Sequence, residues 1–189
     1  MESLSKLFGS AARLKALRLF LFNKDATFTA AEVAERTKLS KEIVRQEVGE
    51  LCAAGLLRKK GTQMPARYQI NPKFEHLGAL DTFIRETTNA HPEHILKSLK
   101  RAGALRVVVL SGFFTGIPDT QIDLLIAGDN LEERALAGAV RSLEAEFGRE
   151  IRYASFATPD FKYRMGVYDR LIRDVFDYPH RLLIDRVGL

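Results

Sequence analysis

The stretch from Thr29 to Asn71 constrains the fold more than any other part of this chain, because it specifies two short helices and a β-hairpin in direct succession. The first helix is predicted to begin at Thr29, since Glu32 follows three positions later. At this spacing each side chain can accept a hydrogen bond from the other residue's backbone N–H, which forms a capping box. A second helix is predicted over residues 41–54, with Ser40 as its N-cap.

The second helix is predicted to have an apolar and a polar face. At about 100° per residue, the apolar arc holds Ile43, Val44, Val48 and Leu51. The opposite arc holds Lys41, Glu42, Arg45, Gln46 and Gly49. Glu47 projects into the apolar arc, where a carboxylate needs a cationic partner or a solvent edge. An apolar back and a polar front suit a helix that packs on a core and enters a DNA major groove.

A basic β-hairpin is predicted directly after this helix. Its strands cover residues 56–60 and 66–70 and flank a turn that contains Gly61 and Pro65. Four cations lie in its strands, where they could meet phosphates: Arg58, Lys59, Lys60 and Arg67. The order helix, turn, helix ending in Ala-Gly-Leu-Leu, then basic hairpin resembles the winged helix-turn-helix of bacterial and archaeal transcriptional regulators.

The resemblance implies a DNA-binding surface built from the helix starts, the polar helix face and the hairpin. The residues assigned to it are Thr29, Ser40, Lys41, Arg45, Gln46, Arg58, Lys59, Lys60 and Arg67. Arg45 and Gln46 carry the side chains best suited to reading base edges. Glu42 is ambiguous, because a carboxylate can accept from cytosine but is repelled by phosphates.

Positive charge is concentrated in the same part of the chain. Residues 1–75 hold 14 Lys and Arg against 8 Asp and Glu, whereas the remainder holds 15 against 16. A basic surplus that coincides with a helix-turn-helix pattern indicates phosphate binding. Double-stranded DNA is therefore the expected partner.

Composition excludes several other classes of protein. The hydrophobic content of 46% is ordinary for a globular protein with a packed core. No apolar run approaches the roughly 18–20 residues of a membrane helix. At the N-terminus, Lys6, Arg13, Lys15 and Arg18 interrupt the apolar residues, which a signal peptide would not allow. The single cysteine, Cys52, cannot form an internal disulfide. A cytoplasmic protein without a membrane partner is expected.

The later part of the chain follows a different pattern. An amphipathic helix is predicted over 74–88, a domain boundary at Asn89-Ala90-His91-Pro92, and a helix over 92–102 that begins with Pro92. Beyond it the predicted elements are strands 105–110 and 122–127, helix 130–147, strand 151–156, a helix with Thr158 as its N-cap, helix 167–176 and strand 182–184. Strands and helices in this order predict a small α/β domain.

Residues 98–189 resemble a nucleotidyltransferase domain of the DNA polymerase β-like superfamily. The resemblance depends on a strand, a turn that contains Gly112, and the run Ile-Asp-Leu-Leu-Ile-Ala-Gly-Asp over 122–129. In that family a Gly-Ser turn holds the triphosphate. An Asp-x-Asp motif and a third carboxylate hold two metal ions, because two divalent cations need several carboxylate oxygens.

This sequence departs from the family pattern at almost every catalytic position. Phe113 follows Gly112 in place of the serine, and Gln121 stands where the first aspartate should be, which leaves Asp123 alone. The strand 151–156 offers no carboxylate, and Arg152 has the wrong charge for a metal site. We therefore expect no enzyme activity, no cofactor and no metal, only a vestigial nucleotide pocket at Gly112, Phe113, Gln121 and Asp123.

Together these observations predict the α+β class: a winged helix-turn-helix domain over 1–73, linking helices over 74–97, and a nucleotidyltransferase-like domain with a mixed sheet over 98–189. The predicted function is sequence-specific DNA binding by a homodimeric transcriptional regulator. The degenerate domain would serve for dimerisation or for sensing a small molecule or nucleotide. Two alternatives remain open, an active nucleotidyltransferase of antitoxin type and a winged helix that binds another protein.

Overall fold

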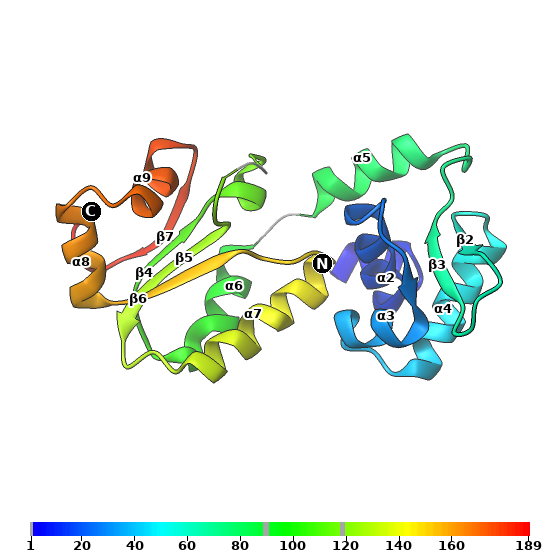
Figure 1. Cartoon of the computed structure of the whole chain (residues 1–189), viewed down its shortest axis with the longest axis horizontal. Coiled ribbons are helices and arrows are strands. Elements are labelled where there is room, and N and C mark those ends of the chain that lie inside the picture. Colours follow the sequence, from blue (N-terminus) through cyan, green and yellow to red (C-terminus); the bar gives the residue numbers. More distant parts are fainter. Residues whose placement is uncertain (1, 89–90, 118–119) are drawn as a thin grey trace. The chain divides into compact units, whose positions relative to one another are not determined.

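The computed structural model describes residues 2–88, 91–117 and 120–189, which form two compact units (Figure 1). The first unit is Met1–Thr88 with Glu144–Arg149, and the second is Asn89–Leu143 with Glu150–Leu189. Both units combine helices with a sheet, which confirms the α+β class. Of the expected domain boundary, Asn89 and Ala90 lie outside the described residues.

The first unit contains five helices and three strands among its described residues. These are α1 (Glu2–Leu7), α2 (Ala11–Phe22), β1 (Phe28–Thr29), α3 (Ala30–Thr37), α4 (Lys41–Ala53), β2 (Leu57–Lys60), β3 (Arg67–Ile70) and α5 (Leu77–Thr87). The strands form an antiparallel sheet in the order β1-β3-β2. The sequence did not predict β1, because two residues are too few to show an alternating pattern.

The predicted helix starts are confirmed by their hydrogen bonds. The Thr29 amide donates to Glu32 Oε2 at 2.6 Å, and the Glu32 amide donates to Thr29 Oγ1 at 3.2 Å. Ser40 accepts from the Ile43 amide at the start of α4. Lys38 ends α3 in the left-handed conformation, with φ of 54°. The two helices therefore begin and end where local chemistry places them.

The core of the first unit forms around α2 and the inner faces of α3 and α4. Val44, Val48 and Leu51 of α4 are buried in it, as expected. Ile43 was expected to join them, and this prediction is wrong, because 42% of the residue is exposed. Ile43 lies about 100° from Val44 around the helix, outside the narrow stripe that the three buried residues define.

The carboxylate of Glu47 has the cationic partner that its position requires. Glu47 is 5% exposed on the buried side of α4, and Arg13 of α2 donates from Nε to Glu47 Oε2 at 2.8 Å. A buried charge is tolerated only when it is paired and hydrogen-bonded. This ion pair therefore joins α2 to α4.

The rest of the chain contains α6 (Pro92–Leu99), β4 (Ala104–Leu110), β5 (Leu124–Asp129), α7 (Glu133–Phe147), β6 (Tyr153–Ala157), α8 (Thr158–Gly166), α9 (Arg170–Asp177) and β7 (Arg181–Asp185), with 3₁₀ turns at Lys100–Ala102 and Gly112–Thr115. The four strands form one sheet in the order β6-β5-β4-β7. β5 and β6 are parallel, and the other two pairings are antiparallel. The expected mixed sheet is confirmed.

Both faces of this sheet are covered. Val107, Val109 and Leu125 pack with residues of α8 and α9 on one face. On the other face, Val108, Leu110 and Leu124 are also buried. Figure 1 shows α6 and α7 along that second face. The α/β character expected from the sequence therefore holds for the second unit.

Several predicted boundaries in the second unit are wrong, and the backbone shows why. The helix expected from Asn130 begins at Glu133, because Asn130 has a positive φ of 51°. The helix expected from Val167 begins at Arg170, where Asp169 accepts hydrogen bonds from two amides as the N-cap. The strand expected from Ile122 begins at Leu124. Thr158 was expected to be an N-cap, but it is the first residue of α8.

Among the residues that the structure describes, no helix combines the length and the apolar character needed to cross a lipid bilayer.

The ion pair between Arg13 and Glu47 gives a first testable prediction. Arg13→Ala should lower the free energy of unfolding by about 2 kcal/mol, because Glu47 then stays buried without its partner. The double variant Arg13→Met with Glu47→Leu should recover most of that loss, since it leaves no unpaired charge. Urea denaturation of the three proteins measures both effects. Equal stability of the single variant and the original protein would contradict the assignment.

Candidate functional site

The exposed face of α4 is the first candidate site. All five residues of the predicted polar arc, from Lys41 to Gly49, are exposed, as expected. The side chains of Lys41, Arg45 and Gln46 make no hydrogen bond or ion pair with any described residue. Because the opposite face of α4 is packed in the core, these side chains are held on a fixed support and remain available to a partner.

Glu42 is a negative charge on this otherwise basic face. A hydrogen bond from its own backbone N–H, and then one from the Ser40 hydroxyl, lower the pKa of the Glu42 carboxyl. Glu42 is therefore ionised at neutral pH and sits one residue from Lys41 and three from Arg45. It reduces the positive potential of the helix face, and Ser40 itself is occupied as the helix cap.

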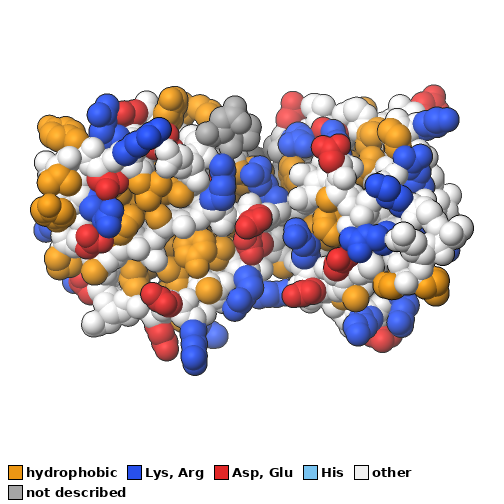
Figure 2. Space-filling model, viewed as in Figure 1, with side chains coloured by type: hydrophobic (Ala, Val, Ile, Leu, Met, Phe, Trp, Pro, Cys, Tyr) orange, Lys and Arg blue, Asp and Glu red, His pale blue; other side chains and the backbone are white. Residues whose placement is uncertain are grey.

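The hairpin formed by β2 and β3 follows α4 directly, and its strand pairing divides its cations. In the register of the two strands, Arg58 lies opposite Gln69, Lys59 opposite Tyr68, and Lys60 opposite Arg67. Because side chains alternate along a strand, Arg58 and Lys60 share one face of the hairpin and Lys59 lies on the other. All three are exposed. Figure 2 shows Lys and Arg side chains recurring over the first unit.

Arg67 and Thr29 have internal roles that the sequence did not reveal. Arg67 donates to the Thr27 hydroxyl at 2.9 Å and to the Thr27 carbonyl at 2.6 Å. Its guanidinium also lies 3.1 Å from Glu32 Oε2. Thr29 is 8% exposed and caps α3. These two side chains hold β3 against the start of α3, whereas the other assigned residues face outward.

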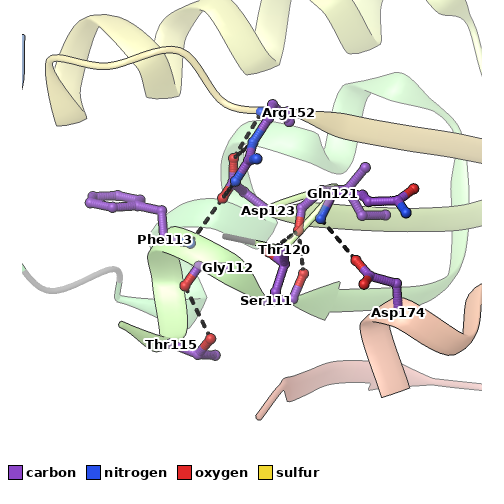
Figure 3. A network of polar contacts seen from close by, with 10 residues as sticks. Ser111, Gly112, Phe113, Thr115, Thr120, Gln121, Asp123, Arg152 and Asp174 are labelled. Carbon is purple, nitrogen blue, oxygen red and sulfur yellow. Dashed lines mark hydrogen bonds and ion pairs between the residues drawn. The ribbon is translucent and has the colours of Figure 1, made fainter. Parts of the chain in front are cut away.

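The second candidate site surrounds Asp123, just before β5 (Figure 3). Asp123 is completely buried. One carboxylate oxygen, Oδ1, accepts from the Phe113 amide at 2.8 Å and from Arg152 Nη2 at 3.0 Å. The other, Oδ2, accepts from the Arg152 amide at 3.0 Å and from Arg152 Nε at 3.1 Å. Both oxygens are therefore fully engaged by the protein.

Electrostatics favours this arrangement. Burial by itself would raise the pKa of Asp123, but hydrogen bonds from Arg152 and from the Phe113 amide, together with the charge of Arg152, hold the pKa below its ordinary value. Asp123 is thus an anion whose charge is already balanced. A metal ion would have to displace the guanidinium, which is planar and matches a carboxylate with two parallel hydrogen bonds.

Gly112, Phe113 and Gln121 lie around the same carboxylate (Figure 3). Gly112 has a positive φ of 53°, and a β-carbon there would collide with the Asp123 carboxylate and the Thr120 hydroxyl. The Gln121 amide donates to Asp174 Oδ2 at 2.8 Å. The structure therefore places Gly112 and Phe113 at the Asp123 carboxylate, whereas the side chain of Gln121 points away from it and its backbone N–H is bound to Asp174 (Figure 3).

Sequence reasoning missed two features of this region. Ser111, which precedes the glycine, donates its hydroxyl to the Ile122 carbonyl at 2.7 Å. Arg152 was noted for its unsuitable charge, but its partner was not identified. The parallel register that places Leu124 beside Tyr153 also places Asp123 beside Arg152, so strand alignment could have indicated the pair. No cluster of three metal-ligating side chains occurs among the described residues.

Comparison with protein-family models, curated proteins and solved structures finds no match for this chain.

The Asp123–Arg152 pair generates a pH-dependent prediction. Because folding lowers the pKa of Asp123, the pair adds stability above the unfolded value of about 3.9, and this contribution is lost as the pH falls through the lowered value. Arg152→Gln should cost about 2 kcal/mol at pH 7 by removing charge-assisted hydrogen bonds. In this variant the pKa of Asp123 moves back towards or above its unfolded value, so the acid destabilisation that comes from Asp123 should shrink and the gap in stability to the original protein should narrow as the pH falls.

Denaturation curves between pH 3 and pH 7 provide the measurement. Arg106→Gln is the matched control, because Arg106 forms an ion pair with Asp129 at 2.8 Å with both side chains partly exposed. Exposed pairs contribute little, so the control should follow the original protein across the pH range. Identical curves for both variants would contradict the special role of Arg152.

Proposed function

We propose that this protein is a sequence-specific DNA-binding transcriptional regulator with a winged helix-turn-helix in its first unit. The observation that carries the proposal is the outward face of α4, where Lys41, Arg45 and Gln46 are exposed while the opposite face is buried in the core. A helix supported in this way can enter a major groove without losing its packing.

Within this proposal the exposed residues have different tasks. Arg45 and Gln46 read base edges, since arginine pairs with guanine and glutamine with adenine by two hydrogen bonds each. Lys41 and the exposed cations of β2 (Arg58, Lys59 and Lys60) bind phosphates, which gives affinity without sequence preference. Thr29 and Arg67 position α3 and β3 instead of contacting DNA, as their internal hydrogen bonds support.

The second unit is proposed to be a degenerate nucleotidyltransferase-like domain without catalytic activity. The observation in support is the saturation of Asp123 by Arg152 and two backbone amides. The unit would then serve a regulator as a dimerisation module or as a sensor of a small effector. Cytoplasmic location and a homodimer with two DNA-binding units belong to this proposal.

Replacing Arg45 with lysine tests base reading separately from charge. Arg45→Lys keeps the positive charge but loses the planar pair of donors, so discrimination at one base position should fall by about 1–3 kcal/mol. The salt dependence of binding should stay unchanged. Selection from a random duplex pool, followed by binding titrations on the selected sequence and its single-base variants, measures this. An unchanged sequence preference would remove Arg45 from the interface.

Replacing Lys60 with alanine tests phosphate binding. Lys60→Ala should weaken binding to all duplexes alike and reduce the slope of log K against log salt by about one. Lys97→Ala provides the charge-matched control, because Lys97 is an exposed lysine of α6 in the second unit. Fluorescence anisotropy from 50 to 300 mM salt gives both slopes.

The original protein decides between the alternative functions. Absence of salt-dependent binding to any duplex would overturn the proposal. A protein partner co-purified without nucleic acid would favour the interaction module. Magnesium-dependent incorporation of labelled nucleotide that disappears in Asp123→Ala would favour the transferase.

A further inference from the structure

The strand β6 (Tyr153–Ala157) is an edge strand that lacks the usual protection against pairing. It lies at one end of the sheet, with β5 as its only neighbour among the described strands. Its sequence, Tyr-Ala-Ser-Phe-Ala, contains no charge and no proline, and its pairing with β5 has no irregularity. Exposed edges present unpaired backbone groups to any other strand. The free edge of β6 can therefore pair with another strand.

The opposite edge of the same sheet is protected. β7 (Arg181–Asp185) begins and ends with a charged residue, and its pairing with β4 is interrupted by a register shift. Charges and irregular pairing are the devices by which proteins prevent association through their edges. Of the two edge strands of this sheet, β6 therefore lacks the charges and the irregular pairing that β7 has.

A groove of about 550 Å³ runs between β6 and α7 in the second unit. The strand contributes Tyr153, which is 37% exposed, and Ser155. The helix contributes Glu133, Arg134, Ala137 and Arg141 to the other wall. Figure 2 shows hydrophobic side chains gathered over β6. A partner that pairs with the strand would therefore also meet this flank of the helix.

Two of the charges along this flank of α7, Glu133 and Arg141, are complementary to each other in a pair of antiparallel copies. Glu133 and Arg141 each lie four positions from Ala137, on either side of it. Neither makes a hydrogen bond or ion pair with a described residue. In two antiparallel copies of α7 centred on Ala137, each Glu133 faces the Arg141 of the other copy. An acidic peptide would meet Glu133, and a basic one would meet Arg134 and Arg141, so a second copy fits best.

We propose that β6 pairs antiparallel with β6 of a second copy of this chain, centred on Ser155, and extends the two sheets into one. The interface is isologous, as in most homodimers, and Glu133 of each copy pairs with Arg141 of the other. This inference names the surface of the homodimer in the proposed function and rests on that proposal only for the expectation of a dimer. Its three variant tests measure the dimer without DNA.

Lysine substitution at the centre of the edge provides the first test. Ser155→Lys places two like charges opposite each other at the two-fold axis, so the dimer dissociation constant should rise at least tenfold in analytical ultracentrifugation. Leu182→Lys on β7 is the matched control and should leave the constant unchanged, since Leu182 is exposed at the other edge. A monomer at all concentrations, or a dimer disrupted only by Leu182→Lys, would overturn the proposal.

Charge reversal provides a second test that is independent of strand pairing. Glu133→Arg and Arg141→Glu should each weaken the dimer, while the double variant should restore it, because the exchanged charges meet again across the axis. Eight positions separate the two residues along α7, which places them about 12 Å apart along one helix, so rescue requires the second copy. Lack of rescue, with each single variant weakened, would contradict the register.

A cysteine at the centre identifies the contact directly. In a Cys52→Ser background, Ser155→Cys should form a disulfide-linked dimer under mild oxidation, whereas Leu182→Cys should remain largely monomeric on a non-reducing gel. Failure of Ser155→Cys to cross-link a dimer seen by ultracentrifugation would also contradict the surface. Fluorescence anisotropy with a labelled duplex separates the two proposals. DNA binding by a monomer would contradict the dimer interface but not the proposed function. A dimer formed through β6 that binds no DNA would contradict the proposed function but not the interface.

Discussion

The buried carboxylate of Asp123 determines how the second unit is arranged around its sheet. Three segments meet at this group: the 3₁₀ turn that contains Phe113, the start of β5, and the start of β6 at Arg152. An uncompensated carboxylate in this position would be very costly, so the turn and the strand must supply donors to it. In a catalytic site such a carboxylate would bind metal ions. Here it links the turn at Phe113 to Arg152 through hydrogen bonds.

Arginines have internal structural roles in both units, which changes how the basic character of the chain should be interpreted. Arg13 balances Glu47, Arg67 holds Thr27 and Glu32, and Arg152 balances Asp123. Segment charge alone treats these arginines like the exposed ones. In the proposed function, only cations such as Lys41 and Lys60, which face outward, contribute fully to phosphate binding.

Local chemistry made the first unit largely predictable. The capping box at Thr29 and the cap at Ser40 depend on residues near in sequence, and the structure confirms them. The helical pattern also predicted that Glu47 needs a partner, but it did not identify Arg13, which lies 34 positions away. The role of Arg67 depends on Thr27, forty positions away, and no local pattern encodes such a contact. The late starts of α7 and α9 likewise follow from single residues, Asn130 and Asp169, whose turn conformations override helical periodicity.

The two units also differ in what their exposed groups can do for a regulator. The exposed face of α4 is polar and rigidly supported, which suits recognition by hydrogen bonds. The edge of β6 is neutral and regular, which suits backbone pairing, where side-chain charge would interfere. Recognition of DNA needs specific donors and positive charge, whereas self-association needs an uncharged edge with complementary flanks. In the proposed regulator these two surfaces are separate, so either one can change without weakening the other, and the second unit has a role that does not require a free carboxylate at Asp123.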